Sequence, residues 1–244
     1  MFRRPTFRRR KRKRSDRRNG AAGDAARTHT EAREEMVRFV SREVRDSRVL
    51  DAMRTVPRHE FVPPDLRGFA YEDSALPIGH DQTISQPLIV GLMTEAAALA
   101  GPDGGERVLE LGAGSGYQAA VLAHLAGVVV TVERIEELRI AAAQRLAQIG
   151  LHNVRCLAAG ERLGAPDEAP FDAILVTAAA PSIPPGLVAQ LAERGRLVIP
   201  VGDRLGQELL VVTKRGGRVR QRSLGGCRFV PLIGDEAFPE HAAW

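Results

Sequence analysis

The chain has few residues of the kind that build covalent or metal-based frameworks. Only two cysteines occur among its 244 residues, Cys156 and Cys227, and they do not have C-x-x-C spacing. This spacing indicates neither a disulfide framework nor a metal site, and it favours a reduced, cytoplasmic setting. No apolar run reaches the length of a transmembrane helix and no signal-peptide pattern opens the chain, so we expect a soluble protein with no membrane contact.

The excess of positive charge is confined to the N-terminus. The whole chain has a net charge of +5, but residues 1–20 hold eleven Lys and Arg against one Asp, which leaves the remainder at about −5. We expect residues 1–30 to form a disordered basic tail and residues 31–244 a single domain. Residues 1–20 could contact nucleic acid or an acidic surface weakly, or could be a solvated tail with no dedicated partner.

A glycine-rich stretch in the middle of the chain carries the first functional signal. The apolar run that ends at Glu110 is followed by Gly112, Gly114 and Gly116, and an alanine-rich segment begins at once. This pattern predicts a strand, a tight loop and a helix. Glycine suits such a loop because it accepts positive φ and lets a ligand approach the backbone. We therefore expect a nucleotide-like ligand here.

A second acidic residue narrows the choice of ligand. Glu133 ends the β-branched run 128–132, about twenty residues after the first glycine, where a carboxylate can hold a ribose diol. Both a dinucleotide and S-adenosylmethionine (SAM) fit this spacing. The G-x-G-x-G pattern differs from the dinucleotide fingerprint G-x-G-x-x-G, and Glu110 would repel a pyrophosphate but suit the ammonium group of a methionine moiety. SAM is therefore favoured.

The N-terminal part predicts two helices and then an irregular segment. Helical spacing begins near Glu31, and a short helix capped by Ser47 runs to Pro57. Residues 57–86 lack periodicity, and irregular segments of that length are usually functional. A helix should begin at Pro87, with Leu88, Ile89, Leu92 and Met93 on its buried face.

The residues just before Pro87 are candidates for an anion site. Thr83, Ser85 and free backbone N–H groups would gather at the start of that helix, and a helix N-terminus favours an anion. Ser85 could instead only cap the helix. His80, a lone histidine, is more often packed or exposed than catalytic.

The C-terminal half alternates strands and helices. We expect helices at 117–126, 135–149 and 187–193, the last capped by Gly195, and strands at 128–133, 154–158, 171–176 and 196–201. A hairpin over 208–213 and 218–224 turns at Gly216 and Gly217. This order predicts an α/β fold: a doubly wound, Rossmann-like SAM-methyltransferase sheet that ends in an antiparallel hairpin, with N-terminal helices.

Six sequence blocks carry a further signal: QTISQP at 82–87, ELGAGSGYQAA at 110–120, VER at 132–134, APFD at 169–172, VTAAAP at 176–181 and RFVPL at 228–232. Taken together and in this order, they resemble the protein-L-isoaspartate O-methyltransferase family. The resemblance covers about residues 33–234. It implies methyl transfer from SAM to the α-carboxylate of L-isoaspartyl residues in damaged proteins, which starts their repair.

The resemblance also implies roles for individual residues. Ser85 corresponds to the active-site serine, and Thr83, Arg228, Phe229 and Val230 correspond to residues along the substrate peptide. The residues that correspond to the SAM site are Ile84, Glu110, Gly112, Ala113, Gly114, Gly116, Glu133, Gly160 and Glu161. A carboxylate is ionised at neutral pH, so the reaction needs no general base, and Ser85 is expected to position the carboxylate rather than attack.

The chain departs from the family pattern at one place. After the third strand the family carries Gly-Asp-Gly, whose aspartate meets the adenine amino group, but here the residues are Ala159, Gly160 and Glu161. Loss of one charge-assisted hydrogen bond would weaken SAM binding about ten- to hundredfold. Two alternatives therefore stand beside the leading interpretation: a weakly active or inactive peptide-binding relative, and a SAM methyltransferase for another acidic substrate or a nucleic acid.

Overall fold

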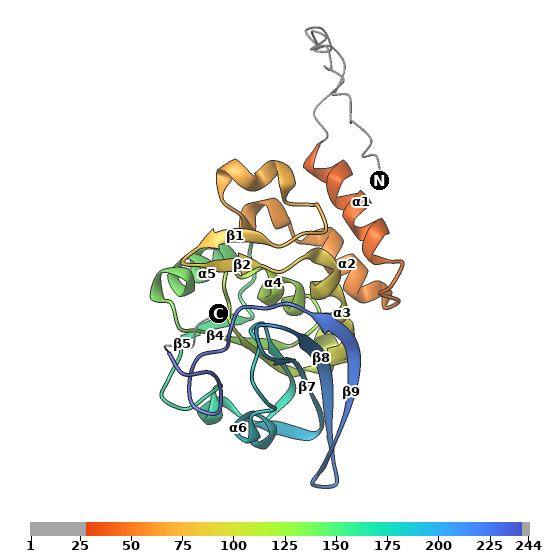
Figure 1. Cartoon of the computed structure of the whole chain (residues 1–244). Helices are drawn as coiled ribbons and strands as arrows, with labels where there is room; N and C mark the ends of the chain where they lie inside the picture. Colours follow the sequence, from red (N-terminus) through yellow and green to blue (C-terminus); the bar gives the residue numbers. More distant parts are fainter. Residues whose placement is uncertain (1–27, 241–244) are drawn as a thin grey trace, which may run out of the picture.

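A mixed seven-stranded sheet forms the centre of the molecule (Figure 1). The computed structural model describes residues 28–240, so residues 1–27 of the predicted tail and the nucleic-acid contact predicted for residues 1–20 lie outside the described residues. The tail boundary at residue 30 was wrong, because Thr28 caps the first helix and that helix begins at His29. The strand order is β5-β4-β3-β6-β7-β8-β9. In chain order the strands are β3 (Arg107–Leu111), β4 (Val128–Glu133), β5 (Val154–Ala158), β6 (Phe171–Val176), β7 (Leu191–Gly202), β8 (Gln207–Arg215) and β9 (Arg218–Cys227).

The first five of these strands are parallel, β8 runs in the opposite direction, and β9 returns to the direction of the first five. β3 pairs in parallel with β4 and β6, β4 with β5, and β6 with β7, whereas β8 pairs antiparallel with both β7 and β9. Gly216 and Gly217 turn the last hairpin with φ of +58° and +71°, values that glycine adopts at low cost. The predicted doubly wound sheet with a terminal antiparallel hairpin is confirmed.

Apolar side chains cover both faces of the sheet. On one face α3 (Pro87–Ala97), α4 (Tyr117–Ala123) and α5 (Glu136–Gln148) pack against the strands, and α1 (His29–Val40) and α2 (Ser47–Thr55) lie beyond α3. The other face buries Leu109, Ile174 and Leu197 under the short helix α6 (Pro185–Ala189) and the 3-10 helix η4 (Pro166–Glu168). None of the helices over residues 28–240 has the length and apolar character needed to span a bilayer.

The predicted helices near the N-terminus differ in detail from the structure. Met36, Val37 and Val40 form the buried face of α1, but Asp46 rather than Ser47 caps α2. The Asp46 carboxylate accepts a hydrogen bond from the Arg48 backbone N–H at 3.0 Å. This leaves Ser47 as the first residue inside the helix.

Two further expectations about helices were only partly right. The helix predicted over 187–193 ends at Ala189, and β7 already begins at Leu191, so that Gly195 lies within a strand. α3 begins at Pro87 and buries Met93 as predicted, but it also buries Val90 and Thr94, whereas Leu88, Ile89 and Leu92 are only half-buried. Packing of α3 against α1 and α2 as well as the sheet explains this, because the helix is covered on more than one side.

The segment 57–86 has more structure than its lack of periodicity predicted. It contains the 3-10 helices η1 (Arg58–Phe61) and η2 (Pro64–Phe69) and a small antiparallel hairpin of β1 (Leu76–Gly79) and β2 (Gln82–Ile84). The buried Arg58 side chain holds the segment by donating from Nε to the Ala70 carbonyl at 2.7 Å. Its guanidinium also lies 4.8 Å from the centre of the Tyr117 ring.

Candidate active site

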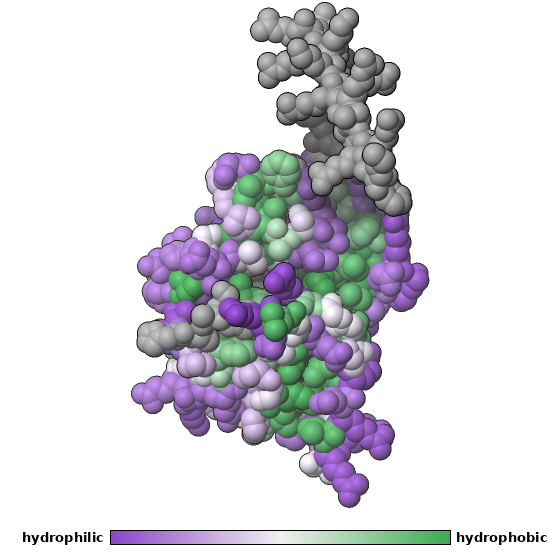
Figure 2. Space-filling model, in the orientation of Figure 1, coloured by the Kyte–Doolittle hydropathy of each residue, from purple (hydrophilic) through white to green (hydrophobic). Residues whose placement is uncertain are grey.

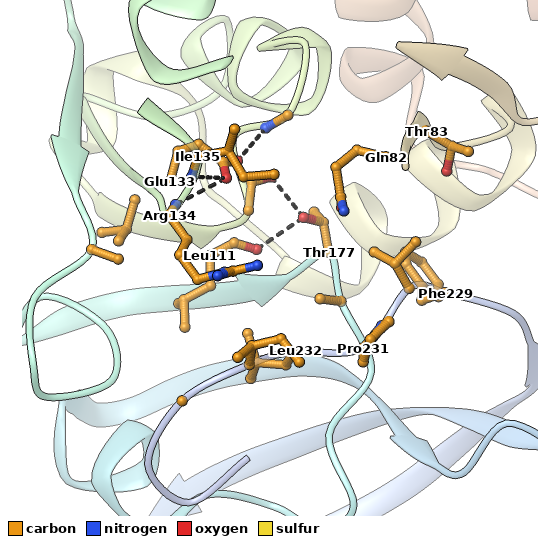
Figure 3. A pocket seen from close by; sticks show the side chains of 18 of the residues that line it. Gln82, Thr83, Leu111, Glu133, Arg134, Ile135, Thr177, Phe229, Pro231 and Leu232 are labelled. Carbon is orange, nitrogen blue, oxygen red and sulfur yellow. Dashed lines mark hydrogen bonds between the residues drawn. The ribbon is translucent and has the colours of Figure 1, made fainter. Parts of the chain in front are cut away.

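A pocket of about 840 Å³ opens at the carboxyl ends of β3, β4 and β6 (Figure 3). Parallel sheets of this kind bind ligands at this edge, where the strand order reverses. Two sides of the pocket come from different parts of the chain. We call Gly112, Gly114 and Glu133 the glycine wall, and we call Gln82, Thr83, Ser85 and residues 228–232 the hairpin wall; all of them line the pocket.

The glycine wall depends on backbone shapes that other residues avoid. Gly112, Gly114 and Gly116 have φ of +94°, +50° and +90°. A Cβ atom at Gly112 would overlap the Thr177 hydroxyl oxygen, and one at Gly116 would lie 3.3 Å from Ala142 of α5. Gly116 therefore permits close helix packing, whereas Gly112 and Gly114 expose backbone to the pocket with no side chain of their own.

Glu133 presents a fixed carboxylate to the pocket. Its Oε2 accepts from the Gly114 N–H at 2.8 Å, and its Oε1 accepts from the N–H groups of Arg134 and Ile135 at 2.9 Å each. Figure 3 shows these hydrogen bonds at the upper end of the pocket. Three backbone donors leave part of the carboxylate's acceptor capacity for hydroxyl groups of a ligand.

Glu110 lies behind the glycine wall and does not line the pocket. The residue is fully buried, and burial raises the pKa of its carboxyl group to about 8. The Thr131 hydroxyl donates to Oε2 at 2.5 Å, while Oε1 has no hydrogen-bond partner among the described residues. At neutral pH the group is therefore largely protonated, which differs from the ionised partner for an ammonium group that the sequence suggested.

The hairpin wall begins with the β1–β2 hairpin. His80 and Asp81 form its tip with φ of +52° and +55°, and both residues are exposed on the pocket rim. Thr83 and Ser85 follow, and neither hydroxyl group has a hydrogen-bond partner within residues 28–240. These two hydroxyls are therefore available to a ligand.

The start of α3 is not a free anion site. Pro87 has no N–H, and the first available N–H, that of Leu88, donates to Asp73 Oδ1 at 2.8 Å. The other oxygen of Asp73 accepts from the Gln86 side chain at 3.3 Å. The expectation of a free helix N-terminus was wrong, because Asp73 already supplies the anion. The alternative that Ser85 caps α3 is also wrong, because Gln86 occupies that position.

The C-terminal segment completes the hairpin wall. Residues 228–232 follow β9 and run beside Ala179, whose N–H donates to the Val230 carbonyl at 2.8 Å and whose carbonyl accepts from Leu232 N–H at 2.7 Å. The buried Gln207 side chain clamps Phe229 by accepting from its N–H at 2.7 Å and donating to its carbonyl at 3.1 Å. Figure 3 shows Phe229, Pro231 and Leu232 below Gln82 and Thr83 across the pocket.

The loop after β5 lines the pocket beside Glu133. Gly160 and Glu161 both lie there and are exposed, and a Cβ atom at Gly160 would meet nothing within 4 Å. The backbone of Gly160 is also outside the left-handed region. An aspartate would therefore fit at Gly160 without strain, so the absence of one here is not enforced by the fold.

Some predicted site residues lie together and others do not. The pocket lining contains these ten: Thr83, Ser85, Gly112, Gly114, Glu133, Gly160, Glu161, Arg228, Phe229 and Val230. Ile84, Glu110, Ala113 and Gly116 are buried behind it. Their assignment to the cofactor stays a prediction. Ile84, Glu110 and Ala113 each adjoin in sequence a residue that lines the pocket, and Gly116 caps the helix that follows the loop.

Sequence reasoning missed several lining residues, of which Thr177 is the most informative. Its hydroxyl donates to the backbone carbonyls of Leu111 or Gly112, at 2.9 and 2.7 Å, and so joins the end of β6 to the glycine wall. The block at 176–181 that carried the family resemblance could have indicated it. Gln82, Arg134 and Ile135 also line the pocket. Within the described part of the chain no three His, Cys, Asp or Glu side chains form a metal-binding group.

Sequence comparison identifies close relatives over nearly the whole described chain. The protein-L-isoaspartate(D-aspartate) O-methyltransferase family matches residues 31–237. The protein-L-isoaspartate O-methyltransferase 1 of Syntrophobacter fumaroxidans is 54% identical over 205 residues, which cover 83% of this chain and 94% of that protein. The protein-L-isoaspartate O-methyltransferase of Methanoregula boonei is 52% identical over 198 residues, which cover 81% and 90%.

Solved structures show the same similarity in three dimensions. A protein-L-isoaspartate O-methyltransferase superposes with a TM-score of 0.73 at 29% identity, over 84% of this chain and 67% of that chain. A putative enzyme of the same name from Plasmodium falciparum, in complex with S-adenosyl-L-homocysteine, gives 0.70 at 25% identity, over 81% and 96%. The resemblance and the fold expected from the sequence are confirmed.

Proposed function

The chain belongs to the protein-L-isoaspartate(D-aspartate) O-methyltransferase family, and from this premise we propose the reaction and the residues that carry it out. The enzyme transfers a methyl group from SAM to the α-carboxylate of L-isoaspartyl residues in damaged proteins. One observation carries the assignment of residues: a single pocket joins the glycine wall to the free hydroxyl groups of Thr83 and Ser85. One wall suits the cofactor and the other suits a carboxylate.

The residues of the glycine wall fit SAM. Gly112 and Gly114 leave room for a ligand against the backbone, and Glu133 offers a carboxylate whose remaining acceptor capacity suits a ribose diol. Gly160 and Glu161 lie next to them in the pocket lining, where the adenine would be placed. When bound, SAM supplies a methyl group on a sulfonium sulfur, and transfer to a carboxylate oxygen leaves a neutral thioether.

The hairpin wall would hold the substrate. The hydroxyl groups of Thr83 and Ser85 can donate to the carboxylate, and residues 228–230, which line the same pocket, would lie along the peptide. The carboxylate is ionised at neutral pH, so no side chain has to remove a proton. Ser85 must orient the anion without binding it tightly, because the reaction removes its charge and a strong ground-state interaction would raise the barrier.

We also propose a single catalytic domain over residues 31–244, working in the cytoplasm. The elements from α1 to β9 pack around one seven-stranded sheet through the apolar clusters on its two faces, which supports one domain. Cys156 and Cys227 are both free thiols, which supports a reducing compartment.

A paired-peptide assay tests the function. The protein is incubated with labelled SAM and an isoaspartyl peptide, or with the same peptide containing a normal aspartyl residue. We expect methylation of the isoaspartyl peptide only. Labelling of both peptides equally, or of neither while SAM binding is retained, would contradict the proposed substrate.

A further inference from the structure

The hairpin formed by β8 and β9 concentrates positive charge in an otherwise acidic domain. Residues 207–227 contain five basic residues and one acidic residue, Glu208. The remainder of residues 21–244 contains 19 basic and 28 acidic residues. The hairpin projects from the sheet at the lower end of the molecule (Figure 1), and Figure 2 shows hydrophilic side chains there beside a smaller hydrophobic area.

The arginines of this hairpin share one face of the sheet. Arg218, Arg220 and Arg222 alternate along β9, and they pair with Arg215, Thr213 and Val211 of β8. Paired residues of antiparallel strands point to the same side, so four arginines line one face. We call Arg215, Arg218, Arg220 and Arg222 the arginine ladder; all four are exposed.

No acidic side chain within residues 28–240 forms an ion pair with the arginine ladder. The ten ion pairs of the described chain all involve other cations. Glu193 lies near the turn, but its carboxylate accepts from the Gly216 N–H. The positive charge of the ladder is therefore not neutralised within the described chain, which makes it available to an acidic partner.

The strand that carries the ladder leads directly into residues 228–232, the C-terminal part of the hairpin wall. β9 is the last strand of the sheet, so its outer row of N–H and C=O groups pairs with no strand of residues 28–240. Its final residues, Gly226 and Cys227, line the pocket, and Arg228 follows directly. At about 3.3 Å per residue, Arg222 lies roughly 20 Å of chain from Arg228. A polypeptide in the pocket can therefore reach the ladder within about six residues.

We propose that the arginine ladder binds acidic segments of the substrate polypeptide and so favours isoaspartyl sites that have acidic residues about six to nine positions away. This inference rests on the proposed function. Guanidinium groups pair with carboxylates in a planar, bidentate manner, and several such pairs act together on an extended chain. Because the ladder is exposed, the effect should be strongest at low salt.

Two matched peptides test the proposal. Each has about twenty residues with a central isoaspartyl residue, and four glutamates or four glutamines stand about six to nine positions away on both sides. We expect the KM of the glutamate peptide to be about tenfold lower at low ionic strength, and the difference to shrink to less than about twofold in about 0.5 M salt.

A pair of double variants locates the effect. Arg220→Gln with Arg222→Gln should bring the KM ratio of the two peptides close to one. The control, Arg38→Gln with Arg42→Gln, removes two exposed arginines at the end of α1 and should keep the ratio of the unmodified protein. Equal KM values for the two peptides at low salt in the unmodified protein would overturn the proposal without any variant.

Two further outcomes are distinguished by the same experiment. Failure to methylate either peptide would contradict the proposed function, whereas methylation of both without a charge preference would contradict only the proposed role of the ladder.

The charged side chains could also serve only to prevent edge-to-edge pairing of β9. In that case the Arg220→Gln, Arg222→Gln variant would aggregate while the peptide preference persisted in its soluble fraction, which overturns the proposal. Anisotropy with a labelled single-stranded DNA of about twenty nucleotides tests the other class of polyanion. The basic residues 1–20 are present in both proteins, so the comparison is between the unmodified protein and the Arg220→Gln, Arg222→Gln variant; a larger loss of affinity for DNA than for the glutamate peptide would also overturn the proposal.

Discussion

The glycine wall and the hairpin wall face each other across one pocket but are assembled differently. The glycine wall comes from one loop and the end of the neighbouring strand, and its shape follows from positive φ at Gly112 and Gly114. The hairpin wall joins residues 82–85 to residues 228–232 from the other end of the chain, and side chains outside the pocket hold each part. Asp73 anchors the first part at Leu88, and Gln207 anchors the second at Phe229. The comparison teaches that a cofactor site can be encoded locally while the facing substrate site depends on distant anchors.

The largest effect is expected from breaking the glycine wall with Gly112→Ala. The new Cβ would require a left-handed conformation and would displace the Thr177 hydroxyl from its carbonyl partners. We expect a loss of about 2 to 3 kcal/mol of unfolding free energy, from denaturant titration, and about hundredfold weaker SAM binding by calorimetry. Gly150→Ala is the control, since Gly150 has φ of +79° with nothing within 4 Å of a Cβ. Equal losses in the two variants would show that the Thr177 contact is unimportant.

Glu110→Gln tests how the buried carboxyl group behind the glycine wall makes stability depend on pH. The folded pKa of Glu110 is about 8 because of burial, against 4.5 in a free chain, so the native state binds the extra proton between these pH values. Stability of the unmodified protein should therefore fall as pH rises from about 4.5 to 8, by a few kcal/mol at most. The variant should lack this fall in denaturant titrations across the pH range. Glu137→Gln, at an exposed position of α5, should behave like the unmodified protein; parallel curves for all three would contradict the prediction.

Ser85→Ala tests whether the hairpin wall acts on the substrate alone. Removing the free hydroxyl should lower kcat about tenfold or more while the Kd for SAM stays unchanged, because Ser85 positions the carboxylate. Steady-state kinetics and calorimetry measure the two quantities. Ser74→Ala removes a hydroxyl from the same segment outside the pocket lining and should change neither. A changed Kd for SAM with unaltered kcat would contradict the assignment.

Gln207→Ala tests the distant anchor of the hairpin wall. Loss of both hydrogen bonds to Phe229 should loosen residues 228–230 and raise the KM for an isoaspartyl peptide about five- to tenfold. The Kd for SAM should stay constant, because the glycine wall does not depend on Gln207. Gln144→Ala on the exposed side of α5 is the control. A similar rise in the Kd for SAM would show that the two walls are not independent.

The smallest effect, and the only gain, is expected from Gly160→Asp. The position has open space and an ordinary backbone conformation, so the substitution restores the family's aspartate without strain. SAM should bind a few-fold to about tenfold more tightly, since one charge-assisted hydrogen bond is added at an exposed site. Gly68→Asp, at another open position away from the pocket, controls for the added charge. Unchanged affinity would indicate that the adenine is recognised without this residue.

The sequence by itself determined the doubly wound sheet with its terminal hairpin and the glycine wall. β4, β5 and β6 begin and end where their β-branched and apolar runs predicted, because regular burial leaves a regular pattern. The same local logic located Gly112, Gly114 and Glu133, since a tight loop and the acid that follows it lie close together in the chain.

Only the tertiary structure decided how the hairpin wall is held and which groups it leaves free. The first N–H of α3 donates to Asp73, and the Phe229 N–H donates to the Gln207 side chain. No pattern in the neighbouring sequence indicates either hydrogen bond. The early start of β7 and the protonated state of Glu110 were equally hidden, because both arise from neighbours that lie far away in the chain. Local patterns determine backbone shape, whereas hydrogen-bond partners and burial depend on which distant segments the fold brings together.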